Sequence, residues 1–334
     1  MTINVGIIDY GSSAKNYHIP FISAVPEYEM IAVLQRTEAP VDISSAAPGS
    51  YCTVDLPGIG HHRTPDEFFA DPDTALIVVA THIDTHSLFA ERALTATDIQ
   101  TLRKLLSQNA LGTITEAELH YDFESPFWLK YMTEKKYTPG QGQGHSFALA
   151  LDQAYTLFGR PSCVTAFFRS QRGIESEIED SYTIILLYTG EQSGLLVTVK
   201  SAVTTPLARQ LKLFVRRTEG SFVKWQQRST CPQEEQIAQG AKLTDPGFGV
   251  EPEKLRGELM TYKEFDSSVQ MFDPETGKYT GLGAWVGVYE NVVGAICGRE
   301  ELEVRPGQVR DVLRNIELAR ESHGRGVMVA WEGL

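Results

Sequence analysis

The stretch Val5-Gly-Ile-Ile-Asp-Tyr-Gly-Ser-Ser-Ala14 decides how the chain begins to fold. Residues Ile3 to Ile8 form a short apolar run rich in β-branched side chains, and this run ends at a glycine turn. Ser12-Ser13-Ala14 then lead into a helical pattern. The N-terminus is therefore predicted to form a strand, a tight turn and a helix.

The next segments continue this alternation. Apolar runs at Met30 to Leu34 and Ala75 to Ala80 predict two further strands. Between them, Arg63 to Phe69 predicts a short helix with Thr64 as its cap and Pro65 at its first position. Near-continuous apolar strands that alternate with helices are typical of a parallel sheet covered on both faces, as in nucleotide-binding α/β domains.

The pattern changes to longer alternating strands in the second part of the chain. Such strands predict an antiparallel sheet with one polar face. They are expected at 115–121, 162–169, 181–188, 194–201 and 210–216. Helices are predicted at 147–158, ending at Gly159-Arg-Pro161, and at 306–323, ending at Gly324. The boundary between the two parts is expected near residue 98.

Composition excludes several classes of function. A net charge of -13 and a pI near 5.1 argue against a general nucleic-acid or anionic-membrane binder, because the average surface field would repel a polyanion. No stretch is apolar enough to span a membrane, and the first residues lack a secretory pattern. The four cysteines are far apart and show no metal-ligand spacing. We expect a cytoplasmic protein without a metal site that binds a small molecule.

Several motifs resemble those of one family in both order and spacing. They are Val5 to Pro20, Arg63 to Phe69, Ala80-Thr-His-Ile-Asp-Thr-His86, Ala110 to Glu118, Asp152-Gln153, Leu157 to Pro161, Gly220-Ser-Phe-Val-Lys224 and Val312 to Ser322. Together they are similar to the Gfo/Idh/MocA family, the relatives of glucose-fructose oxidoreductase and inositol dehydrogenase. The resemblance implies an α/β plus α+β fold: a shortened Rossmann-like parallel-sheet domain at 1–97, then a domain at 98–334 with a large open antiparallel sheet. It also implies a homodimer formed through the outer face of that sheet.

The first departure from the family pattern lies in the glycine turn. The family reads Gly-x-Gly-x-x-Gly/Ala, whereas Asp9 takes the first glycine position here, although Gly11, Ser12, Ser13 and Ala14 follow as expected. That first glycine lets backbone N–H groups approach the pyrophosphate of a dinucleotide. Two unit charges about 4 Å apart interact by roughly 4 kcal/mol at an effective dielectric of 20, close to a thousandfold in affinity. We therefore expect dinucleotide binding to be badly weakened, unless Asp9 turns outward or is protonated.

Three further departures concern residues that the resemblance assigns to cofactor and catalysis. Ile83, two residues after Thr81, replaces an Asn that helps to fix the cofactor. The Glu-Lys-Pro segment with its catalytic lysine is missing, because Ala96-Thr97 runs directly into Asp98. About one βαβ unit of roughly thirty residues is absent with it. Ala148-Leu-Ala150 stands where the family carries an Asp and a His. Arg36, just after the second predicted strand, is suited to a 2′-phosphate and hints at an NADP-using ancestor, although taken alone it is an ordinary surface arginine.

These changes favour a non-redox enzyme that needs no cofactor, such as a cyclase, isomerase or lyase of secondary metabolism, acting on a hydrophobic small molecule in the groove between the domains. Candidate lining residues are His82, His86, Tyr121, Phe123, Phe127, Trp128, His145 and Phe147. Each aromatic or histidine residue taken alone is more often a core or loop residue. The cofactor-site remnants are then Asp9, Gly11, Ser12, Ser13, Ala14, Arg36, Thr81 and Ile83.

Two other functions stay open at this point. One is an NAD- or NADP-dependent oxidoreductase whose geometry has shifted so that the cofactor still binds, and the other is a non-catalytic sensor. A mis-joined coding segment would also delete a contiguous block and leave exposed sheet edges. It would not by itself replace a Gly with Asp or an Asn with Ile.

Overall fold

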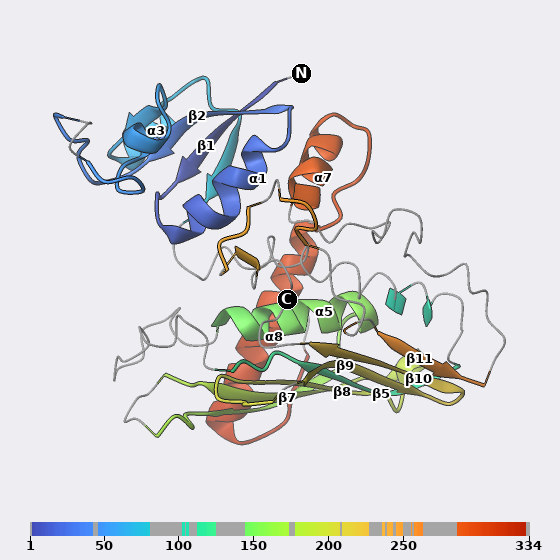
Figure 1. Ribbon diagram of the computed structural model, residues 1–334. Helices are drawn as coiled ribbons and strands as arrows, with labels where there is room; N and C mark the ends of the chain where they lie inside the picture. The colour runs from blue at the N-terminus through green and yellow to red at the C-terminus, as the bar shows by residue number, and fades with distance from the viewer. Residues whose placement is uncertain are drawn as a thin grey trace. The chain divides into compact units, whose positions relative to one another are not determined.

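The computed structural model describes most of the 334 residues. The described residues are 2–42, 46–80, 102–103, 105–106, 112–124, 144–173, 178–207, 209–226, 236–237, 239–242, 245–249, 255, 257–262 and 286–331, with the backbone alone for 144–147. Figure 1 traces the chain. It forms two compact units, Met1–Ala93 with Ala284–Glu303, and Leu94–Gly283 with Val304–Leu334. Residues 284–303, which the sequence analysis places in the second domain, are part of the first unit.

The first unit contains a parallel sheet of four strands in the order β3-β2-β1-β4. The strands are β1 (Ile3–Ile8), β2 (Tyr28–Leu34), β3 (Gly60–His62) and β4 (Leu76–Val79). This order matches the first half of a doubly wound nucleotide-binding fold. β1 is internal because it pairs with β2 on one side and with β4 on the other. Four of its six residues are buried, whereas three of the four residues of β4 are half-buried and Val79 is exposed.

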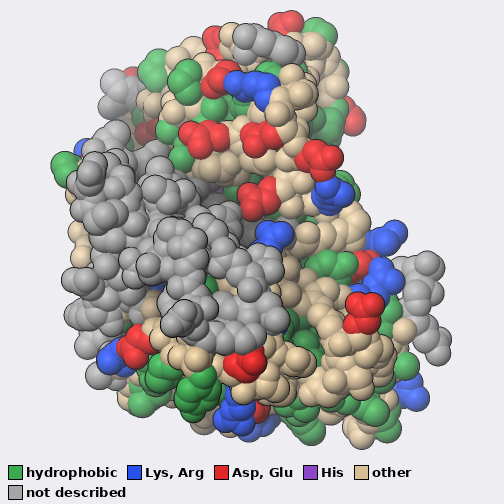
Figure 2. Space-filling view, turned by 90° about the vertical axis from the view of Figure 1, so that its right-hand side faces the viewer, with side chains coloured by type: hydrophobic (Ala, Val, Ile, Leu, Met, Phe, Trp, Pro, Cys, Tyr) green, Lys and Arg blue, Asp and Glu red, His purple; other side chains and the backbone are tan. Residues whose placement is uncertain are grey.

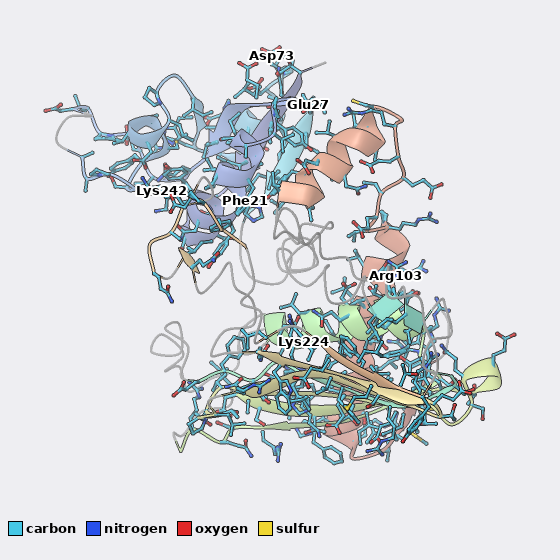
Figure 3. The ribbon with its side chains drawn as sticks, turned by 45° about the vertical axis from the view of Figure 1, so that its right-hand side comes forward. Phe21, Glu27, Asp73, Arg103, Lys224 and Lys242 are labelled. Atoms are coloured by element: carbon cyan, nitrogen blue, oxygen red, sulfur yellow. The ribbon has the colours of Figure 1, made fainter. Side chains whose placement is uncertain are left out.

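Short helices connect these strands. They are the π-helix η1 (Ala14–His18), which continues as α1 (Ile19–Ser23), then α2 (Cys52–Asp55) and α3 (Pro65–Phe69). The predicted start of α3 is confirmed: Thr64 and Glu67 form a reciprocal capping box, and Pro65 occupies the first turn. Phe21, labelled in Figure 3, is buried on α1. The first unit thus has a core on the face of β1 that α1 covers.

Helix α7 (Val286–Ile296) completes that core from a distant part of the sequence. Val293 packs with Ile3, Val5 and Ile22, and Tyr289 packs against the same cluster. The Tyr289 hydroxyl lies 2.6 Å from His18 Nδ1, and burial is the main reason that the pKa of Tyr289 lies above its usual range. His18 is therefore a buried packing residue of the first unit.

The second unit is built on an eight-stranded sheet in the order β11-β10-β9-β5-β8-β7-β6-β12. The longer strands are β5 (Ile114–His120), β6 (Cys163–Arg169), β7 (Ser181–Leu187), β8 (Leu196–Ala202), β9 (Gln210–Arg217) and β10 (Gly220–Gln226); the short ones are β11 (Glu258–Thr261) and β12 (Val329–Ala330). A 3-10 turn, η4 (Gly190–Gln192), precedes β8. The sheet is mostly antiparallel, but β5 and β8 run parallel, which the alternation pattern alone does not reveal.

Two long helices, α5 (Gly144–Phe158) and α8 (Pro306–Arg325), lie on the same side of this sheet (Figure 1). The predicted end of α5 at Gly159 is confirmed, since this glycine has a φ of 74°. The predicted end of α8 at Gly324 is wrong, because the helix continues to Arg325. It ends at Gly326, whose left-handed conformation lets its N–H bond the carbonyls of His323 and Ser322.

The described part of the chain contains no helix long and apolar enough to cross a membrane. On the face shown in Figure 2, acidic and basic side chains are interspersed and no continuous basic patch is visible. This distribution agrees with the net charge of -13. That face would therefore not attract a polyanion uniformly.

Candidate functional site

The candidate site lies at the turn after β1, where Asp9 keeps a backbone conformation that favours glycine. Asp9 has a φ of 84° and is the non-glycine residue with positive φ in the described chain. Asp and Asn tolerate this region better than other side chains, at a cost of roughly 1–2 kcal/mol. The turn therefore keeps its tight geometry although its first glycine is gone.

The carboxylate of Asp9 folds back over its own turn. Oδ1 accepts a hydrogen bond of 2.8 Å from the Tyr10 N–H, while Oδ2 would lie 2.9 Å from a Cβ atom built on Gly11. Asp9 remains exposed to solvent. A negative charge thus lies beside backbone groups that, in an unsubstituted turn of this type, face a phosphate.

A buried tyrosine ties this turn to the segment before α2. The hydroxyl of Tyr10 donates to Asp55 Oδ2 over 2.6 Å, and both carboxylate oxygens of Asp55 accept from the Gly49 N–H over 2.9 Å. Burial raises the pKa of Tyr10, and the adjacent Asp55 carboxylate raises it further. Tyr10 therefore stays a neutral donor at physiological pH.

Lys15 fastens the same loop from the other side. Its Nζ donates to the Gly49 carbonyl over 2.7 Å and lies 5.5 Å from the centre of the Tyr10 ring. Gln35, just after β2, donates to the Ser50 carbonyl and accepts from the Cys52 N–H. The loop before α2 is thereby held against the turn by three separate side chains. The sequence analysis missed this network, and the only signal for it was the tyrosine between Asp9 and Gly11.

The other predicted cofactor-site residues have ordinary local roles. Ser12 Oγ accepts from Asn16 Nδ2, Ser13 precedes the π-helix without capping it through its side chain, and Ala14 is buried. Arg36 is exposed, and its carbonyl accepts a 3.5 Å bond from Arg63 Nε. Thr81 and Ile83 lie outside the described residues. Asp9 and Gly11 thus lie in the turn, and Ser12, Ser13 and Ala14 begin the helical segment that follows it.

Two of the predicted groove residues are packed inside the second unit. Tyr121 and Phe123 are buried, and the Tyr121 hydroxyl accepts a hydrogen bond from Gln153 on α5. Their side chains point inward because alternate residues after β5 face the helices. The backbone of His145 and Phe147 belongs to α5, but their side chains, like all of His82, His86, Phe127 and Trp128, lie outside the described residues.

A separate charged cluster lies on the second-unit sheet. His120 Nε2 is 3.1 Å from Glu118 Oε2, and His120 Nδ1 is 3.2 Å from Asp122 Oδ2. Lys200 Nζ donates to the same Glu118 oxygen over 2.8 Å. Burial alone would raise the pKa of Glu118, but the bonds from Lys200 and His120 outweigh it and lower that pKa. These side chains satisfy one another, and we assign them no catalytic role.

The described residues contain no group of three or more His, Cys, Asp or Glu side chains placed to hold a metal ion. Three of the cysteines, Cys52, Cys163 and Cys297, are free thiols. The pKa of the Cys52 thiol is raised, mainly by burial, so it is a packing residue under α2 rather than a nucleophile.

Comparison with known proteins identifies the second part of the chain. Residues 99–223 match the model of the GFO/IDH/MocA C-terminal domain. Uncharacterized oxidoreductase C115.03 of Schizosaccharomyces pombe is 28% identical over 375 residues, covering 96% of this chain and 97% of its own. The scyllo-inositol 2-dehydrogenase (NADP(+)) IolW of Bacillus subtilis is 24% identical, covering 96% and 94%.

A solved structure supports the same fold. The WlbA dehydrogenase of Bordetella pertussis, determined in complex with NADH and UDP-GlcNAcA, has a TM-score of 0.70 at 14% identity and covers 100% of this chain and 99% of its own. The alignment with the S. pombe relative spans 375 positions, more than the 334 residues of this chain. That relative therefore contains segments that this chain lacks.

Proposed function

We propose that this chain, whose residues 99–223 match the GFO/IDH/MocA C-terminal domain, keeps the fold of that family but works without a bound nicotinamide dinucleotide. We propose a non-redox enzyme that acts on a hydrophobic small molecule by cyclisation, isomerisation or elimination. The observation that carries this proposal is the Asp9 carboxylate, folded over the turn that would otherwise meet a pyrophosphate.

The strength of this effect depends on how well water screens Asp9. At about 4 Å, two unit charges repel by roughly 1 kcal/mol in bulk water and roughly 4 kcal/mol at an effective dielectric of 20. Since Asp9 is exposed, the value for this site lies between these limits. The expected loss of affinity for a dinucleotide is therefore between about fivefold and a thousandfold.

A second line of support concerns proton transfer. Hydride transfer to or from an alcohol needs a group that takes or gives the hydroxyl proton. On α5, the three residues that replace the family's Asp and His segment are Ala148, Leu149 and Ala150, and all three are buried aliphatic side chains. The family's lysine segment is absent from the sequence. The chain thus offers no family-type proton donor at these positions.

The test is a titration with NADPH and NADH, followed by tryptophan fluorescence, of the wild type and two variants. Asp9→Asn removes the charge and keeps a side chain that tolerates positive φ, whereas Asp9→Gly restores the family turn. We expect no saturation of the wild type below roughly 1 mM. Both variants should bind about 5- to 1000-fold more tightly. Micromolar binding by the wild type would overturn the proposal.

A second candidate function is an NAD(P)-dependent oxidoreductase. The names of the relatives favour it, since IolW is described as NADP(+)-dependent and WlbA was determined with NADH. Arg36, exposed just after β2, is a residue type that can meet a 2′-phosphate. Micromolar binding of NADPH, together with reduction of NADP+ by a polyol or oxidation of NADPH by the corresponding carbonyl sugar, would establish this function. Binding without turnover would instead favour a sensor.

The expected homodimer stays a prediction. Glu116, Glu118, His120 and Lys200 lie on the sheet face opposite the buried residues of β5 and β8, and their charges are paired with neighbouring side chains. On β6, Phe167 is an exposed aromatic residue. A mixed face of this kind is compatible with either solvent or a partner, and sedimentation of the purified chain would decide.

A further inference from the structure

Strand β9 ends in two consecutive arginines whose surroundings differ. Arg216 has a side chain that is 61% exposed, and its Nη1 lies 2.8 Å from Glu116 Oε2. Arg217 follows Leu213 and Val215 on the opposite face of the strand, and both of these residues are buried. The side chains of these two neighbouring arginines thus project from opposite faces of β9 into different environments.

The guanidinium of Arg217 is poorly satisfied. Its Nε and Nη1 atoms are shielded from solvent and have no hydrogen-bond partner within the described part of the chain. Burial lowers the pKa of Arg217. Taking a cation out of water without an acceptor is unfavourable, and natural proteins normally pair such groups.

Other arginines of the second unit differ from Arg217 in having an ion pair, although Arg172 Nη2 and Arg314 Nε are also shielded and without a hydrogen-bond partner in the described part of the chain. Each has a carboxylate oxygen within ion-pair distance: Arg172 with Asp180, Arg314 with Glu317, and Arg320 with Glu179. Arg217 has no such ion pair among the described residues. The contrast indicates that its counter-ion is not part of the described chain.

The residues that face Arg217 on the neighbouring strands are uncharged. Its register partners are Ile114 on β5 and Gly220 on β10, and the next residue on its own side of β10 is Phe222. The nearest acidic residue in sequence, Glu219, directs its carboxylate toward Gly112, where Oε2 would lie 2.7 Å from an added Cβ. The surroundings that the strands provide are therefore largely apolar.

We propose that Arg217 binds an oxyanion, the carboxylate or phosphate group of a small molecule. Guanidinium is suited to this because it stays charged and offers planar, directional donors that match both groups. An apolar setting strengthens the interaction by reducing the screening from water. The proposed site is in the second unit and does not depend on Asp9 or on a dinucleotide.

Lys224, labelled in Figure 3, is the basic residue of the neighbouring strand β10. It is fully buried, and its Nζ donates to the Leu255 carbonyl. The proposal therefore rests on Arg217 and not on Lys224.

The test is thermal unfolding in sodium phosphate and, separately, in sodium malonate, each against sodium chloride at matched ionic strength. We compare the wild type with Arg217→Gln and with the adjacent control Arg216→Gln. At an anion concentration roughly ten times the dissociation constant, the wild type should gain about 3 °C. The Arg216→Gln control should gain the same, and Arg217→Gln should gain nothing.

General salt stabilisation would raise all three proteins alike, and that result would overturn the proposal. So would the absence of any shift in the wild type, which remains decisive even if Arg217→Gln fails to fold. A response to phosphate alone would assign the site to a phosphate group, and a response to malonate alone would assign it to a carboxylate. Replacing Asp9 with Gly should leave the anion response unchanged, so this test and the dinucleotide titration can fail independently.

Discussion

Asp9 in the first unit and the aspartates Asp180 and Asp311 in the second use their carboxylates differently. In the second unit, Asp180 and Asp311 are buried, and each is bonded to an arginine. In the first unit, Asp9 is exposed, and its carboxylate accepts a hydrogen bond from the backbone N–H of the next residue. The carboxylates of Asp180 and Asp311 stabilise the fold, whereas that of Asp9 contributes little to its stability. The glycine-to-aspartate change therefore alters the candidate site rather than the fold.

The largest expected loss of stability comes from removing the carboxylate of Asp180. Its side chain is 2% exposed, that of Arg172 is 7% exposed, and Oδ2 accepts from Arg172 Nε over 2.8 Å. Asp180→Ala leaves a buried cation and should lower the free energy of unfolding by about 3 kcal/mol. Urea unfolding followed by the fluorescence of Trp225 and Trp331 measures this. Arg216→Gln, which breaks an exposed ion pair, should lower the free energy of unfolding by less than about 1 kcal/mol. Equal losses in the two variants would contradict the distinction between the buried and the exposed pair.

A smaller effect is expected at Asp311, and it depends on pH. Burial alone would raise the pKa of Asp311, but bonds of 2.6 Å from Tyr155 and 2.7 Å from Arg160 outweigh it and lower that pKa. A lowered pKa stabilises the fold above the unfolded value of about 3.9, and that stability is lost as pH falls toward the folded value. Asp311→Asn should therefore cost about 1.5 kcal/mol at pH 7 and less at pH 3.

The measurement is urea unfolding at several pH values. Between about pH 5 and pH 3, the wild type should lose more stability than Asp311→Asn, because only the wild type must protonate a bonded carboxylate. If the free energy of unfolding fell equally with pH in the two proteins, protonation of Asp311 would not be linked to unfolding.

The smallest expected effect is at Asp9 itself. Because its φ of 84° favours glycine, Asp9→Gly should raise the stability of the first unit by about 0.5 kcal/mol. Asp9→Ala, which cannot bond its own backbone, should lower it by about 1 kcal/mol. Hydrogen exchange of the β1 amides reports on this unit. A clear loss of stability in Asp9→Gly would mean that the Asp9 carboxylate stabilises the fold.

Much of the fold could be predicted from local sequence. The eight predicted strands lie within two residues of observed ones, whereas β3, β10, β11 and β12 were not predicted. The capping box at Thr64 and Glu67 follows from residue types three positions apart. The parallel pairing of β5 with β8 was missed, because alternation shows which residues share a face but not which strand lies alongside. The role of α7 in the first unit was missed for a similar reason, since its contacts span more than 250 residues.

The candidate site, too, could be predicted only in part from the sequence. The sequence singled out Asp9 because a carboxylate replaces a glycine in a turn with a known steric requirement. It could not show where the carboxylate points, nor that Tyr10, Lys15 and Asp55 fasten the neighbouring loop to that turn. Tyr121 and Phe123 were candidates for a groove, and the structure places them in the core.

The sequence by itself determined the two-part architecture and the resemblance to the Gfo/Idh/MocA family, because periodicity, caps and turn residues act over a few neighbouring positions. It also placed a negative charge at the first turn. Only the tertiary structure decided that this charge folds back onto its own backbone, and that Arg217 is shielded while Arg216 is paired. Solvation and charge pairing depend on groups that are distant in sequence, and these distances are fixed only when the chain has folded.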